Sequence, residues 1–376
     1  MHPVGYSEKG WSFVSSNIKE NLVELVGDID KQINPLLFSA VVDKTIAHIA
    51  KSFPKTGDSF QIPIENGSSW ILHEYIVEEI PLGSPKLEGN FFFDFVRNRI
   101  VMCAYGLTSS EEGAPPLLIM PGTTFPGQRG CLQSVMSAFT PFGNVGEFAY
   151  WSGKENINSW LEKQERVRGY GISQGGALLE LALQDHSQKF AQANIISAPG
   201  LVNGWKHDIG DKAVETRIYI QLTDPVSKIG QFPEGENTRL YTTSLLEPDY
   251  KSLSWWMDLF FGWIAHFQDC LITTKNISII PSSNIQAYNN SSERTFRTTA
   301  HKVISVVMFF LAPLIVLICE GSLLFSAGCS KLGELTRNSW HQLRKSERLK
   351  SLCISVKNAV GAIVIKNGNL STSVPK

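Results

Sequence analysis

The chain has 376 residues, of which 43% are hydrophobic and 10% aromatic, and its formal net charge at pH 7 is -1. A chain of this length and composition buries a sizeable core, so one large domain with appendages is the simplest interpretation. A net charge this close to zero gives no general attraction for polyanions, which argues against nucleic acid as a partner.

The cysteines and the amino terminus argue against a zinc site, a disulfide-rich secreted protein and a cleaved secretory leader. The 6 cysteines have neither the paired spacing of a zinc site nor the density of a secreted disulfide scaffold, so we predict reduced, buried thiols. No metal and no organic cofactor is implied. The first residues, Met1 to Lys9, lack the basic and apolar regions of a secretory leader, so we predict no cleavable signal peptide.

Residues 1–59 are predicted as an N-terminal helical region. Apolar residues recur at helical spacing between Ile18 and Phe53, with a break expected near Pro35. Short β-branched and aromatic runs then predict strands that open a mixed sheet. These runs are Phe60–Ile64, Ser69–Val77, Phe91–Phe95 and Arg99–Tyr105.

From Pro116 onward, short apolar runs alternate with helical stretches. The predicted strands are Pro116–Met120, Arg166–Tyr170, Ala193–Ser197 and Thr216–Leu222. The predicted helices between them are Gln133–Ala138, Asn156–Lys163 and Gly175–Lys189. This alternation predicts an α/β fold of the α/β-hydrolase type over residues 60–275, with a mostly parallel sheet and helices on both faces.

A serine with small neighbours lies at one of the predicted strand-to-helix turns. Ser173 is flanked by Gly171 and Gly175, and it follows a strand and precedes a largely apolar helix. A nucleophilic hydroxyl is exposed on such a sharp, strained turn, and the crowded backbone leaves room only for small neighbours. We therefore predict Ser173 as a nucleophile and the two glycines as its elbow; an ordinary serine in a Gly-rich turn is the alternative.

The partners of such a serine follow it in the order acid, then histidine. Asp224 comes directly after the strand Thr216–Leu222, at the edge where catalytic loops gather, so it is the predicted acid. A turn-forming Asp before Pro225 is the alternative. Of the later histidines, His301 and His341 adjoin or follow an apolar segment, which leaves His266 as the predicted base, with a merely packed histidine as the alternative.

An oxyanion intermediate needs two hydrogen-bond donors. The backbone N–H of Gln174 is one, because this residue follows the nucleophile at the start of a helix. The second is predicted at Thr123, since Gly122 lets the loop after an apolar strand turn toward the site. A simple β-turn at Gly122 is the alternative.

Several of these segments resemble successive landmarks of the class 3 lipases over Leu117 to Phe267. They are Gly122-Thr123, Gly171 to Leu178, Ser197 to Gly200 and Asp224-Pro225. The resemblance implies a Ser173, Asp224 and His266 triad with Thr123 and Gln174 at the oxyanion hole; Ile172 departs from the histidine usual in that family. Over its full length the chain resembles the chlamydial 43 kDa protein family, which implies a hydrolase-like fold and membrane attachment and brings no substrate.

The C-terminal third is divided by composition into a polar linker at 276–302, a hydrophobic membrane segment at 303–329 and a basic tail at 330–376. The hydrophobic segment is interrupted by one charge, Glu320, and is long enough for a tilted span. The basic flank predicts a cytoplasmic tail. A hydrophobic hairpin bent at Pro313 and buried against the domain is the alternative.

The leading hypothesis is a membrane-associated serine acyl-hydrolase, of lipase or esterase type, with an ester or lipid substrate and membrane lipid as its partners. The alternative is a catalytically inactive hydrolase-fold scaffold at the membrane. An aromatic run, Trp255–Trp263, is interpreted as core, with a lid as the other possibility. Because all the proposed catalytic residues precede Cys270, we expect deletion of 303–376 to leave a soluble domain.

Overall fold

The computed structural model describes residues 35–66, 69–83, 100–205, 214–221, 224–245, 266, 277–282 and 285–345. Two compact units divide the chain within its last helix: the first ends at Leu317 and the second begins at Ile318. The sheet and all the predicted catalytic residues belong to the first unit. The predicted strand Phe91–Phe95 and the aromatic run Trp255–Trp263 lie outside the described residues.

One mixed sheet contains 9 strands that are neighbours in their sequence order. They are β1 (Ser59–Asn66), β2 (Ser69–Pro81), β3 (Cys103–Thr108), β4 (Leu117–Met120), β5 (Val167–Ile172), β6 (Phe190–Ile196), β7 (Glu215–Gln221), β8 (Thr238–Leu245) and β9 (Ile277–Ser282). The strands from β4 to β8 pair in parallel. The outer pairs, from β1 to β4 and between β8 and β9, are antiparallel.

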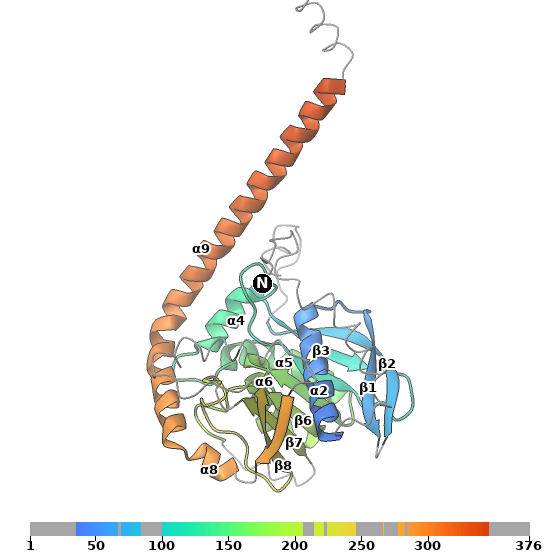
Figure 1. Cartoon of the computed structure of the whole chain (residues 1–376), viewed down its shortest axis with the longest axis vertical. Helices are drawn as coiled ribbons and strands as arrows, with labels where there is room; N and C mark the ends of the chain where they lie inside the picture. Colours follow the sequence, from blue (N-terminus) through green and yellow to red (C-terminus); the bar gives the residue numbers. More distant parts are fainter. Residues whose placement is uncertain are drawn as a thin grey trace, which may run out of the picture. The chain divides into compact units, whose positions relative to one another are not determined.

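Helices cover both faces of this sheet (Figure 1). They are α2 (Pro35–His48), η1 (Ile49–Ser52), α4 (Cys131–Ala138), α5 (Glu147–Glu162), α6 (Gln174–His186), η2 (Ser187–Lys189), α8 (Ile285–Asn289) and α9 (Ser292–Lys345). Successive residues of β4 point to opposite faces, as the period of a strand requires. Leu118 packs in the core with α5 and α6, whereas Leu117 packs in the core with α2. The predicted α/β class is confirmed.

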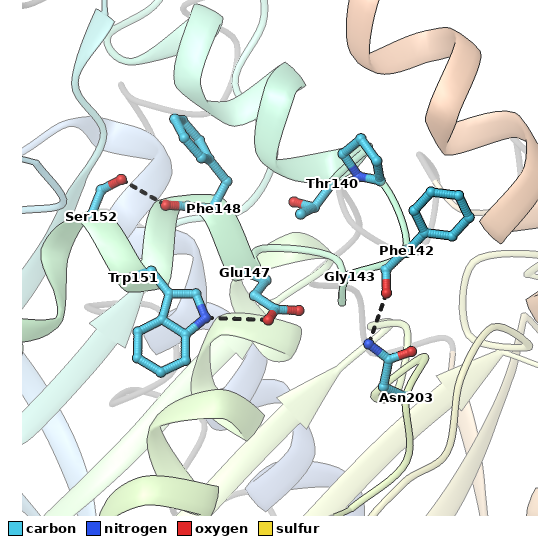
Figure 2. A pocket seen from close by; sticks show the side chains of 9 residues that line it. Thr140, Phe142, Gly143, Glu147, Phe148, Trp151, Ser152 and Asn203 are labelled. Carbon is cyan, nitrogen blue, oxygen red and sulfur yellow. Dashed lines mark hydrogen bonds between the residues drawn. The ribbon is translucent and has the colours of Figure 1, made fainter.

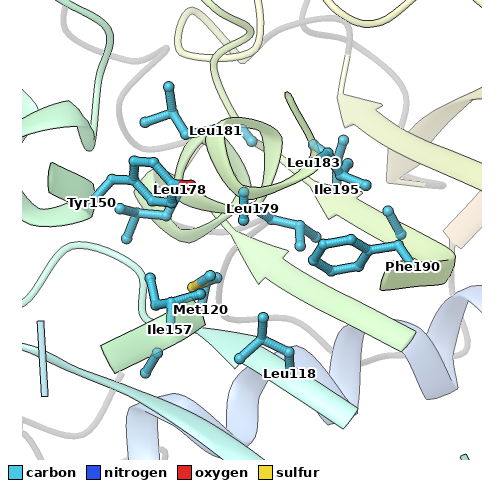
Figure 3. Packing of buried hydrophobic residues seen from close by; sticks show 14 of the residues in the cluster. Leu118, Met120, Tyr150, Ile157, Leu178, Leu179, Leu181, Leu183, Phe190 and Ile195 are labelled. Atoms are coloured by element: carbon cyan, nitrogen blue, oxygen red, sulfur yellow. The ribbon is translucent and has the colours of Figure 1, made fainter. Parts of the chain in front are cut away.

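The core behind β5 is built on α6, which is buried along most of its length. Leu178, Leu179 and Leu183 of this helix pack with Phe190 and Ile195 of β6 (Figure 3). Each such side chain stabilises the fold by about 1.5–3 kcal/mol when fully buried. The helix that follows Ser173 is therefore fixed on the sheet, as its apolar sequence predicted.

Several predicted boundaries differ from the observed ones; for example, α5 begins at Glu147 rather than at Asn156, and β2 continues to Pro81 rather than ending at Val77. The helix α2 begins at Pro35, where a break was expected, because proline is well suited to the first turn of a helix. The third strand begins at Cys103 rather than at Arg99. The residues before Pro35 lie outside the described part.

Residues 276–302, predicted as a polar linker, contain β9, α8 and the first turns of α9 instead. The polar composition of residues 276–302 has a structural cause, because polar side chains of these elements form hydrogen bonds with the backbone of the rest of the domain. Asn289 donates to and accepts from the backbone of Phe232, at 3.0 Å in each case. Arg294, which is 2% exposed, contacts backbone carbonyls of the loop after β7. Buried polar groups of this kind are not visible in a hydropathy pattern.

The hydrophobic segment forms part of one continuous helix, α9, which passes through Pro313 without a break. The predicted alternative of a hairpin is therefore wrong for residues 303–329. Over Ser292–Ser322 the helix is long and apolar enough to cross a membrane, and 17% of its most apolar window is buried. A core helix of a soluble protein is mostly buried, so this exposure favours a span over a core position.

Candidate active site

Ser173 forms the turn between β5 and α6 and has backbone angles of φ 56° and ψ -129°. A positive φ at a non-glycine residue costs about 1–3 kcal/mol and persists only when the surrounding structure holds it. Two backbone hydrogen bonds do so here. Ser173 N donates to Ile196 O at 2.9 Å, and Gly176 N donates to Ser173 O at 2.9 Å. The predicted nucleophile position therefore has the strained conformation of an elbow.

The two flanking glycines are required by close backbone contacts. A Cβ atom at Gly171 would lie 2.2 Å from the carbonyl oxygen of Gly175. A Cβ atom at Gly175 would lie 2.4 Å from the carbonyl oxygen of Met120. Both obstacles are backbone atoms of neighbouring elements, which do not move aside as a side chain does. Any larger residue at either position would displace α6 from the sheet.

Ser173, His266 and Asp224 form one line of hydrogen bonds. Ser173 Oγ lies 2.9 Å from His266 Nε2, and His266 Nδ1 lies 2.8 Å from Asp224 Oδ2. The exposed fractions of the three residues are 8%, 4% and 0%. With Nδ1 donating to the carboxylate, Nε2 accepts from the serine hydroxyl, which is the tautomer that a general base needs.

Asp224 is oriented by its own loop. Its Oδ1 accepts a hydrogen bond from Val226 N at 2.8 Å, and its Oδ2 accepts one from Ser227 Oγ at 2.8 Å. The carboxylate follows β7 closely, so it lies at the end of a parallel strand, as predicted. Because a buried carboxylate needs several hydrogen-bond donors, these contacts fix the orientation of the Asp224 side chain toward His266.

Arg294, from the first turn of α9, holds the loop that carries Asp224. Its Nη1 donates to Ser227 O at 2.8 Å and its Nη2 to Ile229 O at 3.2 Å, and its Nε donates to Gly230 O. The guanidinium also lies over the Phe232 ring, with 4.4 Å between Cζ and the ring centroid. One side chain thus satisfies three carbonyls and fixes the shape of the acid loop.

The positive charge of Arg294 also acts on a carboxyl of α6. Glu180 is fully buried, and its burial raises its pKa well above the ordinary value, while the charge of Arg294 acts in the opposite direction. A neutral Glu180 avoids the large cost of an isolated buried charge. Glu180 and Arg294 are thus two buried polar side chains between α6 and the start of α9.

The two predicted oxyanion residues, Thr123 and Gln174, line the same cavity as Ser173 and His266. The loop of Thr123 lies against the elbow, because a Cβ at Gly122 would be 2.9 Å from Ile172 O and 3.8 Å from Ser173 Cβ. Gln174 begins α6, so its backbone N–H is one of the free donors at a helix start. Both predicted oxyanion residues therefore lie at the cavity that contains Ser173 and His266.

A buried serine of α4 connects these two donor segments. Ser134 Oγ donates to Gln174 Oε1 at 2.8 Å and accepts from Thr124 N at 2.9 Å. Gln174 Nε2 in turn donates to Ser134 O at 2.9 Å. These bonds fix the loop that carries Thr123, the predicted oxyanion loop, relative to the elbow.

A second hollow, of about 540 Å³, contains none of the predicted catalytic residues. It is lined by Phe142, Glu147 and Trp151 among others, and Figure 2 shows Asn203 donating to the Phe142 carbonyl at 2.9 Å. Ser173 and His266 line the first cavity, together with Thr123 and Gln174. Among the described residues, no group of three or more His, Cys, Asp and Glu side chains could hold a metal ion.

Four of the five predicted site residues, Thr123, Ser173, Gln174 and His266, line one cavity, and the fifth, Asp224, is hydrogen-bonded to His266. The sequence missed three residues that support them. Of these, Ser227 is close in sequence to Asp224, three positions beyond it, but a serine at this spacing is not by itself a signal. Ser134 and Arg294 gave no local signal, because each acts on a segment far away in the chain.

No family model matches the chain, and no curated protein or solved structure is significantly similar to it.

Proposed function

We propose that this protein is a serine acyl-hydrolase that cleaves acyl esters. The observation that supports this most strongly is the unbroken line from Ser173 Oγ through His266 to Asp224, at 2.9 and 2.8 Å. A buried serine in a strained elbow, hydrogen-bonded to a histidine that is oriented by a carboxylate, is the arrangement that activates a hydroxyl.

The reaction follows from these positions. Ser173 Oγ attacks the ester carbonyl while its proton passes to His266 Nε2, and the charge of Asp224 stabilises the imidazolium. The carbonyl oxygen becomes an oxyanion that accepts from the backbone N–H groups of Gln174 and Thr123. His266 then protonates the leaving alcohol, and an acyl-enzyme remains on Ser173. Water, deprotonated by His266, attacks the acyl-enzyme and releases the acid.

We further propose that the fold is of the α/β-hydrolase type and related to the class 3 lipases. The supporting observations are the parallel order of β4 to β8 and the places of the nucleophile, acid and base, which follow β5, β7 and β8 in the sequence. A relation to the chlamydial 43 kDa family, which the full-length sequence resembles, is likewise a hypothesis. Neither relation identifies a substrate beyond the acyl ester that the site itself suggests.

We also propose that α9 anchors the protein in a membrane through its apolar part. Apolar side chains on this helix are widely exposed, among them Val307 at 55% and Leu314 at 56%. An exposed apolar helix of this length is stable in hydrocarbon, because its backbone groups are hydrogen-bonded internally.

The test is hydrolysis of p-nitrophenyl butyrate by the full chain in a mild detergent. Ser173→Ala, His266→Gln and Asp224→Asn should each lower kcat by roughly a thousandfold or more, because triad members act as a unit. Ser152→Ala, at an exposed serine of α5, is the matched control and should keep full activity. Turnover that survives in Ser173→Ala contradicts the proposal, and a folded wild-type protein without turnover points to a scaffold.

A further inference from the structure

The cavity beside the triad is mostly apolar and has a volume of about 360 Å³. Ser173 and His266 are on its wall together with apolar side chains such as Val135 and Phe139. Binding sites for small ligands are of this size and have this character, with a few polar groups among many apolar ones. Besides the residues of the proposed chemistry, the polar residues of the lining are Lys51, Arg297 and His301, and the apolar remainder is available for the rest of a substrate.

One side of this cavity is formed by α9. Phe296, Ala300 and Ile304 line it, and their spacing of four residues places them on one stripe of the helix. His301, beside them, stacks on Phe139 with 6.4 Å between ring centroids. Thr298 Oγ1 accepts a hydrogen bond from Gly230 N at 2.8 Å. These contacts make the first turns of α9 a part of the site.

The same helix continues as an exposed apolar surface. Phe296 is 73% exposed and Val303 66%, and Val307 and Phe310 follow one and two turns later, at 55% and 68%. The apolar lining of the cavity thus adjoins the apolar surface of a helix that has the length and composition of a membrane span. A hydrocarbon chain in a bilayer around α9 would meet apolar groups all the way to the serine.

The cavity also holds one buried polar atom outside the triad and the oxyanion loop. His301 Nε2 has no hydrogen-bond partner in the described part of the chain. An unsatisfied buried nitrogen costs about 1–3 kcal/mol, and an oxygen of a bound ester would satisfy it. This second observation points to a ligand that carries oxygen atoms next to a long apolar part.

Building on the proposed acyl-hydrolase function, we propose that this cavity is an acyl-chain site whose wall is α9. The substrate is then an acyl ester lipid of the bilayer in which α9 lies. Its carbonyl binds at Ser173, its hydrocarbon chain runs along Phe296, Ala300 and Ile304, and an ester oxygen accepts a hydrogen bond from His301 Nε2 in the tautomer that carries the proton there. A lipid bound in this way need not leave the membrane to react.

A pair of tryptophan variants of the full chain tests the wall. Ala300→Trp fills the stripe that lines the cavity, whereas Val303→Trp adds the same side chain on the exposed side of the same helix. In Ala300→Trp the ratio of rates on p-nitrophenyl palmitate and p-nitrophenyl butyrate should fall at least about tenfold. In Val303→Trp the ratio should stay within about twofold of wild type.

Ile304→Ala keeps the test decisive if the tryptophan variant does not fold. Removing this side chain from the cavity should raise KM for the palmitate ester several-fold more than KM for the butyrate ester, so the palmitate to butyrate ratio of rates should fall. A palmitate to butyrate ratio that moves in neither variant overturns the proposal while the hydrolase function stands. A wild-type protein that cleaves neither ester contradicts the hydrolase function itself.

The source of the lipid is tested with the full chain reconstituted in dioleoylphosphatidylcholine vesicles. A fluorescent long-chain acyl ester is placed either in the vesicles that carry the protein or in separate, protein-free vesicles. Release should be at least about tenfold faster when ester and protein share a bilayer. Equal rates in the two arms overturn uptake from the bilayer.

Discussion

The two halves of the triad are fixed by different kinds of contact. The serine half is held by neighbours along β4, β5 and α6, for example by Gly176 N, three residues beyond Ser173. The acid half is held by Arg294, which is 67 residues beyond the carbonyl of Ser227 that it binds. A local sequence pattern can therefore specify the elbow, whereas the acid loop depends on docking of the helix α9.

The largest effect is expected where the elbow has no room. Gly171→Ala introduces a Cβ that would lie 2.2 Å from the Gly175 carbonyl oxygen, so the free energy of unfolding should fall by about 4 kcal/mol, or the chain should fail to fold. Gly321→Ala is the control, because a Cβ there has no heavy atom within 4 Å. Equal stability of the two variants in chemical denaturation would show that the elbow is not constrained as described.

The second-largest loss of stability is expected when the contacts that hold the acid loop are removed. Arg294→Met leaves three backbone carbonyls without their donor, which should destabilise the fold by roughly 3 kcal/mol. We expect kcat on the butyrate ester to fall at least about tenfold with little change in KM, because the loop moves Asp224 rather than the cavity.

Arg294→Lys should recover part of that stability and of kcat, since one ammonium replaces one of the lost donors. Arg239→Met, at an exposed arginine of β8, is the matched control and should behave as wild type. If Arg294→Met keeps full kcat, the acid loop is held by other contacts and the proposed contrast between the two halves is wrong.

The opposite face of the sheet gives a pH dependence that is separate from catalysis. Burial raises the pKa of Asp43, on α2, from 3.8 to about 6, although Arg217 and the Tyr219 hydroxyl act to lower it. Because the folded-state pKa is the higher one, this group stabilises the fold most below pH 3.8. The contribution is lost as the pH rises through 6, by no more than about 3 kcal/mol.

Asp43→Asn removes this titration, so the free energy of unfolding of wild type should fall relative to the variant between pH 4 and pH 7. The pH profile of ester hydrolysis should be the same in both proteins, since Asp43 lies on the face of the sheet opposite to α6. Parallel stability curves for the two proteins would contradict the raised pKa.

The smallest effect is expected from one hydrogen bond within the acid loop. Ser227→Ala removes a donor at 2.8 Å from Asp224 Oδ2 but leaves Val226 N in place, so stability should fall by about 1 kcal/mol and kcat by less than tenfold. The measurement is again butyrate hydrolysis beside chemical denaturation. A loss as large as that of Arg294→Met would mean that the loop is held locally.

The sequence predicted the parts of the fold that carry a local pattern. The strands β4 to β7 and the helix α6 were expected from apolar runs, and Ser173 was expected from its glycines, because sharp turns have few permitted residues. The strands β8 and β9 and the helix α8 were not expected. The residues of β8 are largely polar, and the short apolar run of β9 fell within the predicted polar linker together with α8.

Arg294 and Ser134 show why the rest of the site was out of reach. Each satisfies backbone or side-chain groups on a different element, and nothing next to them in the sequence marks that partner. For His266 the order of residues was enough to select it, but its distance of 2.9 Å from Ser173 Oγ follows only from the folded chain.

The central claim, that Ser173 is an activated nucleophile, is tested most directly with a fluorophosphonate probe on the full chain, read by intact mass and peptide mapping. The wild-type protein should gain one label, on Ser173, Ser173→Ala should gain none, and His266→Gln should react at least about a hundredfold more slowly. A folded wild-type protein that stays unlabelled, or that is labelled at another residue, would contradict the account.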